Sequence, residues 1–254
     1  MLAALKSLLK PSEQSRPSVI GRLTYAIGDI HGRDDLFEKM IERIRGDSAL
    51  LGERPVIVLL GDYIDRGASS REVLDRILSL EHADWCDLVA LLGNHEETLL
   101  NFLSDASCGP AWVEYGASAT LASYGVYTPA MRTDPEAWEQ VREDLVTAVP
   151  PAHVDLLKRM RLTYRDGDYF FVHAGVRPDV PLEAQGAEDF LWIRGAFLQA
   201  RQACEYVVVH GHTPAEAPAN DRWRVGLDTG AYATGTLTAM RFKEESRFVM
   251  DVRV

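Results

Sequence analysis

Residues 55–67 have the sequence PVIVLLGDYIDRG, in which a continuous apolar run leads directly into a glycine-bounded polar motif. A short run of this kind is typical of a strand that is buried on both faces. Four further apolar runs, at residues 23–27, 88–92, 169–172 and 206–209, also end at polar motifs. Those motifs are GDIHG (28–32), GNHE (93–96), HAG (173–175) and HGHT (210–213). We therefore predict five strands that carry polar residues at their carboxyl ends.

Helices are predicted after the first two motifs. Residues 34–45 place their apolar side chains on one stripe of a helix. A second helix is expected from Ser69, whose spacing to Glu72 is that of a capping box. Alternating strands and helices predict parallel strands joined by right-handed crossovers.

The end of the chain has a different pattern. Residues 224–228, 235–242 and 246–252 are rich in β-forming residues and are joined by short polar or glycine turns. This pattern favours strands that follow one another in an antiparallel meander. We therefore predict a mixed α/β fold, with parallel strands first and antiparallel strands last.

The length of 254 residues suits one large α/β domain with a sizeable core. We assign residues 1–18 to an N-terminal extension and linker, and residues 19–254 to a single domain. For residues 1–10 (MLAALKSLLK) we favour fraying or packing on the domain over an amphipathic helix at a membrane surface. Residues 104–150, with a helix expected over 134–149, are interpreted as an insertion on the substrate side. For the aromatic-rich part of this insertion, an ordinary packing cluster is an equal alternative.

Composition excludes several classes of protein. The chain has 27 basic and 38 acidic residues, and a net charge of −11 argues against stable nucleic-acid binding. No run approaches the length of about 18 apolar residues that a transmembrane helix needs. The three cysteines are scattered and form no CxxC motif, which fits a reduced intracellular protein. We expect a cytoplasmic protein.

Five of the seven histidines directly follow predicted strands. They are His31, His95, His173, His210 and His212. The carboxyl ends of parallel strands converge, so these histidines, together with Asp29, Asp62 and Asn94, indicate a metal site. Oxygen and nitrogen donors without cysteine suit manganese, iron, zinc or cobalt. The donors suffice for two divalent ions, which a carboxylate such as that of Asp62 can bridge.

Two arginines complete this pattern. Arg66 follows the second motif directly, and Arg194 lies in the segment LWIR. Guanidinium groups stay charged and bind phosphate oxygens at two points, so a phosphate ester is the expected substrate. For Arg194 an ordinary surface ion pair is an equal alternative.

The five motifs together resemble those of the bacterial metal-dependent phosphoprotein phosphatases, a branch of the calcineurin-like metallophosphoesterase superfamily. They are GDIHG, GDYIDRG, GNHE, HAG and HGHT. The resemblance implies mixed sheets packed as a β-sandwich flanked by helices, with the active site at the carboxyl ends of the strands. It implies a dinuclear phosphomonoesterase, foremost a protein serine/threonine phosphatase. In such enzymes a hydroxide that bridges two metal ions attacks phosphorus directly. Manganese is the expected metal, with iron or zinc as alternatives.

The resemblance also implies a role for each matched residue. The metal ligands it implies are Asp29 and His31 for one ion, Asp62 as the bridge, and Asn94, His173 and His212 for the other. His95 would be the general acid, with Asp65 orienting it. Arg66 and Arg194 would clamp the phosphate. His210 is not at a ligand position of the motif, and we favour a supporting role over an alternative ligand.

The sequence leaves two other functions open. The first is a symmetrical hydrolase of dinucleoside polyphosphates such as diadenosine tetraphosphate; the sequence GDYIDRG followed by GNHEE favours the phosphatase over it. The second is a non-catalytic scaffold, which the complete ligand set argues against. The expected partner is a phosphorylated protein or a small phosphate ester, and the sequence leaves the oligomeric state open.

Overall fold

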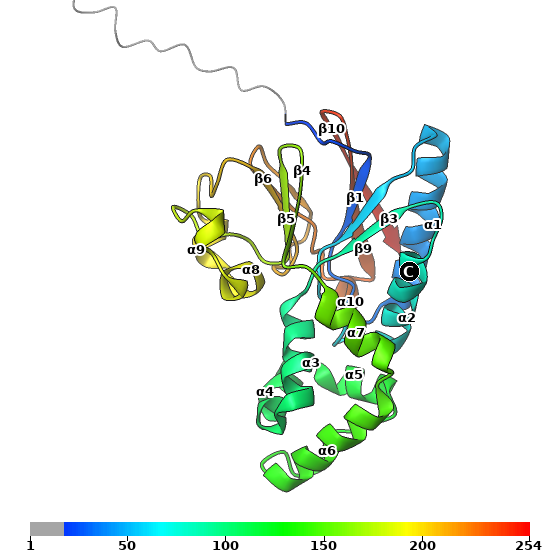
Figure 1. The fold of residues 1–254 in the computed structure, drawn as a ribbon, viewed down its shortest axis with the longest axis vertical. Helices are drawn as coiled ribbons and strands as arrows, with labels where there is room; N and C mark the ends of the chain where they lie inside the picture. Colours follow the sequence, from blue (N-terminus) through cyan, green and yellow to red (C-terminus); the bar gives the residue numbers. More distant parts are fainter. Residues whose placement is uncertain (1–17) are drawn as a thin grey trace, which may run out of the picture.

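The computed structural model describes residues 18–254, so the expectation for residues 1–10 lies outside the described residues (Figure 1). The described chain contains two five-stranded sheets. Figure 1 shows the two sheets side by side, with helices on their outer faces and a group of helices extending from one end. None of the helices over residues 18–254 is both long enough and apolar enough to cross a bilayer.

The first sheet has the strand order β10-β9-β1-β2-β3. Its strands are β1 (Thr24–Ile27), β2 (Val56–Leu59), β3 (Asp87–Ala90), β9 (Thr236–Lys243) and β10 (Ser246–Arg253). The strands β1, β2 and β3 run parallel, as predicted. β9 is antiparallel to β1 and forms a hairpin with β10. Because the first three strands are parallel, the motifs that follow them emerge at one edge of the sheet.

The second sheet has the strand order β4-β5-β6-β8-β7. Its strands are β4 (Thr163–Asp166), β5 (Tyr169–Val172), β6 (Val207–His210), β7 (Ala219–Asn220) and β8 (Arg224–Gly226). The central strands β5, β6 and β8 are parallel, and the edge strands β4 and β7 are antiparallel to their neighbours. The HAG and HGHT motifs therefore also emerge at a common edge.

The predicted antiparallel meander is wrong in its first strand. β8 lies in the second sheet, parallel to β6, with Val225 opposite Val209. Only β9 and β10 form the expected antiparallel pair. Val225 and Phe242 belong to the same apolar core between the sheets, so a β-rich segment can bury its side chains in either sheet. The sequence pattern therefore predicts the strand but does not select its sheet.

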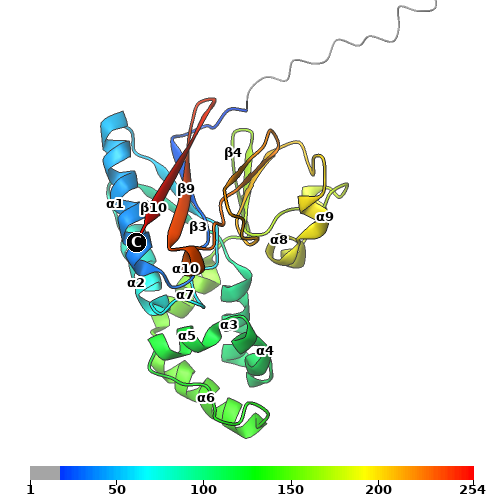
Figure 2. The ribbon, with the colours of Figure 1, turned by 180° about the vertical axis from the view of Figure 1, so that it is seen from behind.

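The two sheets pack face to face around an apolar core. Ala26 and Val58 contribute to this core from the first sheet, and Phe171 and Val209 contribute from the second. The flanking helices are α1 (Asp34–Leu51) and α2 (Ser70–Glu81) beside the first sheet, and α8 (Ala187–Trp192) and α9 (Gly195–Leu198) beside the second (Figures 1 and 2). A short helix, α10 (Ala231–Thr234), connects β8 to β9. This arrangement confirms the predicted sandwich of mixed sheets flanked by helices.

The first two helices differ from their predictions in detail. α1 continues past residue 45 to Gly52, whose left-handed φ of 69° forms the C-terminal cap. α2 follows Ser69, but the side chain of Ser69 makes no capping hydrogen bond, so the predicted capping box is wrong. The backbone N–H of Ser69 instead donates to the carbonyl of Gly32, because the loop before α2 packs against the first motif.

Residues 94–159 form a helical segment at the end of the sandwich (Figures 1 and 2). It comprises α3 (Asn94–Ser104), α4 (Gly109–Glu114), α5 (Ala117–Ser123), α6 (Pro135–Ala148) and α7 (Pro151–Arg159). α6 lies where a helix is predicted, whereas the patterns above did not predict α3, α4, α5 and α7. Trp112 and Leu145 share one apolar cluster with Phe37 of α1, so the segment packs onto the same core as α1. The aromatic-cluster alternative fits Trp112 and Tyr124, which are buried in the core, but not Tyr115 and Tyr127, which are exposed.

Candidate metal centre

Side chains from both sheets meet at the carboxyl edge of the parallel strands. They are Asp29 and His31 after β1, Asp62 after β2, Asn94 and His95 at the start of α3, His173 after β5 and His212 after β6. All seven are buried. The ligand atoms of His31, Asp62 and His95 lie within 4.8 Å of one another, and so do those of Asp62, His173 and His212. Asp62 therefore belongs to two potential metal sites.

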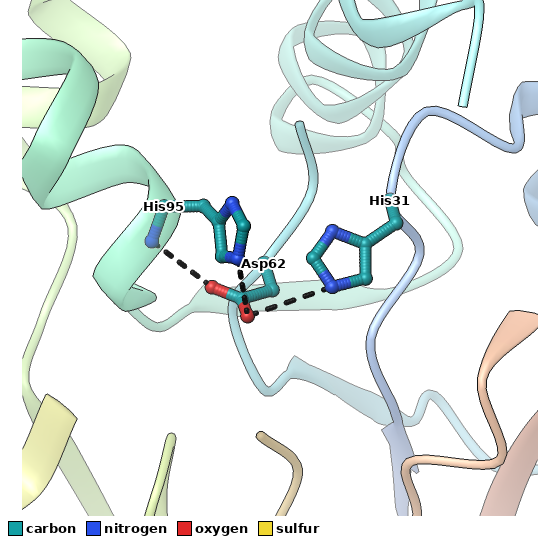
Figure 3. Close-up of side chains that lie close together, drawn as sticks. All are labelled: His31, Asp62 and His95. Atoms are coloured by element: carbon teal, nitrogen blue, oxygen red, sulfur yellow. Dashed lines mark hydrogen bonds and ion pairs between the residues drawn. The ribbon is translucent and has the colours of Figure 1, made fainter. Parts of the chain in front are cut away.

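The two carboxylate oxygens of Asp62 face different histidines. Oδ2 lies 3.7 Å from Nε2 of His31 and 3.8 Å from Nε2 of His95. Figure 3 draws both contacts as dashed lines. Oδ1 lies 3.3 Å from Nε2 of His173. Burial opposes the ionisation of Asp62, but the adjacent His173 and His95 hold its pKa well below the ordinary value. An ionised carboxylate in this position can bridge two cations.

Asn94 and Asp29 lie beside these groups. The Oδ1 atom of Asn94 is 2.9 Å from Nε2 of His173. The carboxylate of Asp29 accepts hydrogen bonds from the backbone N–H of His212 at 3.0 and 3.2 Å. A Cβ atom on Gly211 would come within 2.0 Å of Asp29 Oδ1, so only glycine allows this approach. The structure thus brings together all six predicted ligands.

The rings of His31 and His173 are oriented by backbone carbonyls. Nδ1 of His31 lies 2.8 Å from the carbonyl of Ile64, and Nδ1 of His173 lies 2.8 Å from that of Leu60. A carbonyl only accepts, so Nδ1 donates in both rings. Burial lowers the pKa of His31 to about 3, which leaves a lone pair on its Nε2 atom. A hydrogen bond from the ring nitrogen that does not face the metal is the usual way in which a protein fixes a metal-binding imidazole.

In the described chain, the unpaired ring nitrogens of His212 indicate that these residues fit a metal ion. Within residues 18–254, neither of its buried ring nitrogens has a hydrogen-bond partner. Burial lowers the pKa of His212 to about 2, and nearby His173 adds to the effect, so the imidazole is neutral. Burial raises the pKa of Asp29 well above its ordinary value, as do the charges of Asp228 and Asp62. Divalent cations would compensate these carboxylates and bind the free imidazole nitrogens, so the residues fit metal ions.

The backbone around the site is strained. Seven non-glycine residues have a positive φ within the described part of the chain, and five of them lie in the site motifs. Those five are His31, Asp62, Asp65, Arg66 and His212. Non-glycine residues occupy this region at a cost of about 1–3 kcal/mol each, and only where their surroundings hold them. The clustering of strain at the strand ends is typical of a functional site.

Glu96 holds much of this strained loop in place, and the sequence analysis missed it. Its carboxylate accepts hydrogen bonds from the backbone N–H groups of Asp62, Tyr63 and Ile64, at 2.8–3.2 Å. It also accepts one from Gly93 at 3.0 Å, as in a capping box. That spacing, with Glu96 three residues after Gly93, is a signal the sequence does carry.

His95 and Asp65 form a buried pair. Nδ1 of His95 lies 2.6 Å from Oδ2 of Asp65. Burial opposes the charged imidazolium, but Asp62 and Asp65 outweigh it and raise the pKa of His95 to about 9. Since Nδ1 is engaged by Asp65, Nε2 is the atom that can present a proton to the site.

The two predicted arginines lie at the rim of the site. The Arg66 guanidinium packs over the ring of Tyr232 at 4.6 Å, and its Nη2 atom is 3.5 Å from Nε2 of His95. Arg194 is exposed, and its charge contributes to the lowered pKa of His212. In the described chain neither guanidinium forms an ion pair with a carboxylate. The surface ion pair considered for Arg194 is therefore absent from residues 18–254.

His210 is buried and belongs to neither of the two groups. Its Nδ1 atom is 2.9 Å from the carbonyl of Gly211, and its ring packs edge-on against Phe197 at 5.0 Å. Asp228 is a further buried carboxylate near Asp29 that the sequence analysis missed. It follows β8, whose parallel pairing with β6 brings it toward Asp29.

Comparison with known proteins supports the assignment to a phosphoesterase. The family model described as calcineurin-like phosphoesterase matches residues 23–247. An asymmetrical bis(5'-nucleosyl)-tetraphosphatase of Anoxybacillus flavithermus is 27% identical, with 86% of this chain and 89% of the relative covered. A symmetrical bis(5'-nucleosyl)-tetraphosphatase of Acidovorax ebreus is 28% identical, with 86% of this chain and 66% of that longer relative covered. A crystal structure assigned as a diadenosine tetraphosphatase shares the fold, with a TM-score of 0.61 at 17% identity over 93% of this chain and 98% of that chain.

Proposed function

This chain belongs to the calcineurin-like phosphoesterase family, and from that premise we propose that it is a dinuclear metal hydrolase that cleaves dinucleoside tetraphosphates. The observation that carries the hydrolase function is the position of Asp62 in both groups of potential ligands. The substrate is suggested by the relatives, which are named as tetraphosphatases. They favour the dinucleotide alternative over the protein phosphatase that the motifs place first.

We assign the metal ligands as the motifs imply. Asp29, His31 and Asp62 would hold one divalent ion, and Asp62, Asn94, His173 and His212 the other. Two divalent ions at such a site supply Lewis acidity, which activates water and offsets the charge of the phosphoryl oxygens. The identity of the metal rests on the donor set alone, and manganese, iron and zinc all suit it.

The other residues of the site would bind the phosphate and donate a proton to the leaving group. Arg66 and Arg194 lack carboxylate partners in the described chain, so their guanidinium groups are available for phosphate oxygens. His95 would donate the proton on Nε2 to the leaving oxygen, while Asp65 holds Nδ1. His210 would support the site from behind its metal ligands.

Two exposed tyrosines favour a nucleotide substrate. Tyr232 is 40% exposed and lies edge-on to His31, with their ring centroids 5.5 Å apart. Tyr115 is 49% exposed and lies edge-on to His95 at 6.3 Å. An exposed aromatic ring offers a stacking surface for a base, worth about 1–3 kcal/mol. Rings next to two different site histidines suit a substrate that carries a base at each end.

One observation favours a second candidate, a phosphomonoesterase that acts on phosphoproteins. The leaving group of a tetraphosphate is itself a phosphate and needs little protonation. An alkoxide leaving group, as in phosphoserine or phosphothreonine, needs a general acid. The His95–Asp65 pair, with the pKa of His95 raised to about 9, provides such an acid.

The experiment that separates these candidates is a panel of substrates with the manganese-loaded protein. It compares diadenosine tetraphosphate with phosphoserine, phosphothreonine and phosphotyrosine peptides by kcat/KM. We expect a preference of at least about tenfold for the dinucleotide, equal to about 1.4 kcal/mol in the transition state. A preference of that size for a phosphopeptide would favour the second candidate. Products of two ADP, or of ATP and AMP, would distinguish symmetrical from asymmetrical cleavage.

A further inference from the structure

We propose that Trp112 and Thr120, which lie outside every sequence motif, are positioning residues for proton transfer by His95. They belong to the helices α4 and α5 of the helical segment. The inference rests on the proposed hydrolase function and adds to it a part of the chain that was interpreted as a substrate-side insertion or a packing cluster.

Both oxygens of the Asp65 carboxylate accept hydrogen bonds from the helical segment. Oδ2, which contacts Nδ1 of His95 at 2.6 Å, also accepts from Nε1 of Trp112 at 2.8 Å. Oδ1 accepts from the hydroxyl of Thr120 at 2.6 Å. Asp65, Trp112 and Thr120 are all fully buried. These donors therefore fix the plane of a carboxylate that in turn fixes the ring of His95.

The same segment also holds the backbone on which Asp65 sits. Asp65 and Arg66 both have a φ of 69°, a left-handed conformation that disfavours non-glycine residues. The backbone N–H of Asp65 donates to Thr120 Oγ1 at 2.8 Å and to Ser70 Oγ at 3.1 Å. The backbone N–H of Arg66 donates to the carbonyl of Gly116 at 3.1 Å. The strained backbone and the oriented carboxylate are thus both held by the helical segment, and Ser70 of α2 adds one further contact.

The orientation of the Asp65 carboxylate decides how His95 presents its proton. A buried carboxylate that loses one of its donors can rotate, and the imidazole that it orients rotates with it. The loss would affect only a step that needs the proton on His95 Nε2. Loss of Trp112 Nε1–H should therefore slow the release of poor leaving groups more than that of good ones, while metal binding stays intact.

The test is Trp112→Phe in the manganese-loaded protein, with Trp138→Phe as its matched control. Both tryptophans are buried beside Phe102, with ring centroids 5.1 and 6.0 Å from it. The indole of Trp138 donates to the backbone carbonyl of Arg132 rather than to the site. We expect Trp112→Phe to reduce kcat/KM for phenyl phosphate at least about tenfold and that for 4-nitrophenyl phosphate less than about threefold. Trp138→Phe should leave both within about twofold of the wild type.

Thr120 provides an independent pair of variants if Trp112→Phe fails to fold. Thr120→Val removes the hydroxyl and should show the same unequal losses, whereas Thr120→Ser keeps the hydroxyl and should restore the wild-type ratio. A readout that does not depend on activity is the indole N–H resonance of Trp112, identified by its loss in Trp112→Phe. This resonance should shift in Asp65→Asn, because its acceptor changes.

The outcomes separate the positioning role from the proposed function. If Trp112→Phe and Thr120→Val lose equal activity on both substrates, or none, while His95→Asn shows unequal losses, the positioning role is wrong and the hydrolase function stands. If the metal-loaded wild type hydrolyses no phosphate ester or anhydride, the proposed function fails and the positioning role fails with it. An indole resonance unmoved in Asp65→Asn would overturn the hydrogen bond itself.

Discussion

Asp62 Oδ1 lies 3.3 Å from Nε2 of His173, although these two residues follow strands in different sheets. The site is therefore assembled only when the first sheet, which contains β2, packs against the second, which contains β5. Two of the predicted ligands of the second ion, His173 and His212, come from across this junction. Metal binding and the packing of the sandwich should accordingly stabilise each other.

His95→Asn should keep its metal content but lose activity on poor leaving groups. The variant removes the proton on Nε2 without removing a proposed ligand. We expect kcat/KM for phenyl phosphate to fall by a factor of about 10²–10⁴, the usual contribution of a general acid. The loss for 4-nitrophenyl phosphate should be much smaller. Equal losses on the two substrates would contradict the role of His95 as an acid.

Glu96→Gln should destabilise the loop of the second motif. The carboxylate accepts four backbone N–H groups, and an amide would turn its own donor toward some of them. We expect a loss of about 3 kcal/mol in the free energy of unfolding, measured by urea denaturation. Glu97→Gln is the matched control, because the neighbouring Glu97 accepts from the Trp192 indole at 2.8 Å. Equal losses in the two variants would show that the backbone contacts of Glu96 add nothing to the free energy of unfolding.

Tyr232→Leu should weaken binding of the dinucleotide specifically. Loss of a stacking ring is worth about 1–3 kcal/mol, so KM for diadenosine tetraphosphate should rise about tenfold or more. Activity on 4-nitrophenyl phosphate, which has no base, should change less than about twofold. Tyr232→Phe keeps the ring and should match the wild type, and Tyr127→Leu serves as a control at an exposed tyrosine away from the site histidines. A similar change on both substrates would indicate an indirect effect through Arg66.

The stability of the metal-free protein should depend on pH through His95. Its pKa is raised to about 9 in the folded chain, above the ordinary value of about 6.5 in the unfolded chain. The folded state therefore binds the proton more tightly, and this stabilisation is complete below about pH 6.5 and is lost as the pH rises to about 9. It amounts to about 3 kcal/mol at most.

His95→Asn should flatten that slope in part, because the pKa of His173 is also raised: burial opposes its charge, but Asp62 outweighs the burial. The measurement is the free energy of unfolding in the presence of a chelator, from pH 6 to pH 9.5. Identical slopes for the wild type and the variant would contradict the raised pKa of His95.

The strands of this fold could be predicted because the information is local. Val56–Leu59 and Tyr169–Val172 are continuous apolar runs that end at chemically distinct motifs, and both form buried strands. The pairing of β8 could not be predicted, because the short β-rich pattern around Val225 does not specify which sheet it joins. The helix α7 was also missed; its buried residues are His153, Leu156 and Leu157, and two apolar positions in a nine-residue element are too few to establish a period.

The predicted ligands of the site could be placed together for a similar reason. Each lies within a few residues of a predicted strand end, and parallel strands bring those ends to one edge. Trp112 and Thr120 escaped prediction because they reach Asp65 across 47 and 55 residues of sequence. Such contacts depend on how the helical segment packs, and neither spacing nor residue type indicates them.

Metal stoichiometry tests the proposal that Asp62 joins two metal ions in one site. The measurement is the number of divalent ions per chain in wild-type protein and in Asp62→Asn, after reconstitution with manganese and removal of unbound metal. Asp155→Asn, an exposed position in α7, is the control for a surface carboxylate. We expect two ions in the wild type and in the control, and a loss of metal together with activity in Asp62→Asn. A fully metallated Asp62→Asn, or a wild type that binds no divalent ion, would contradict the claim.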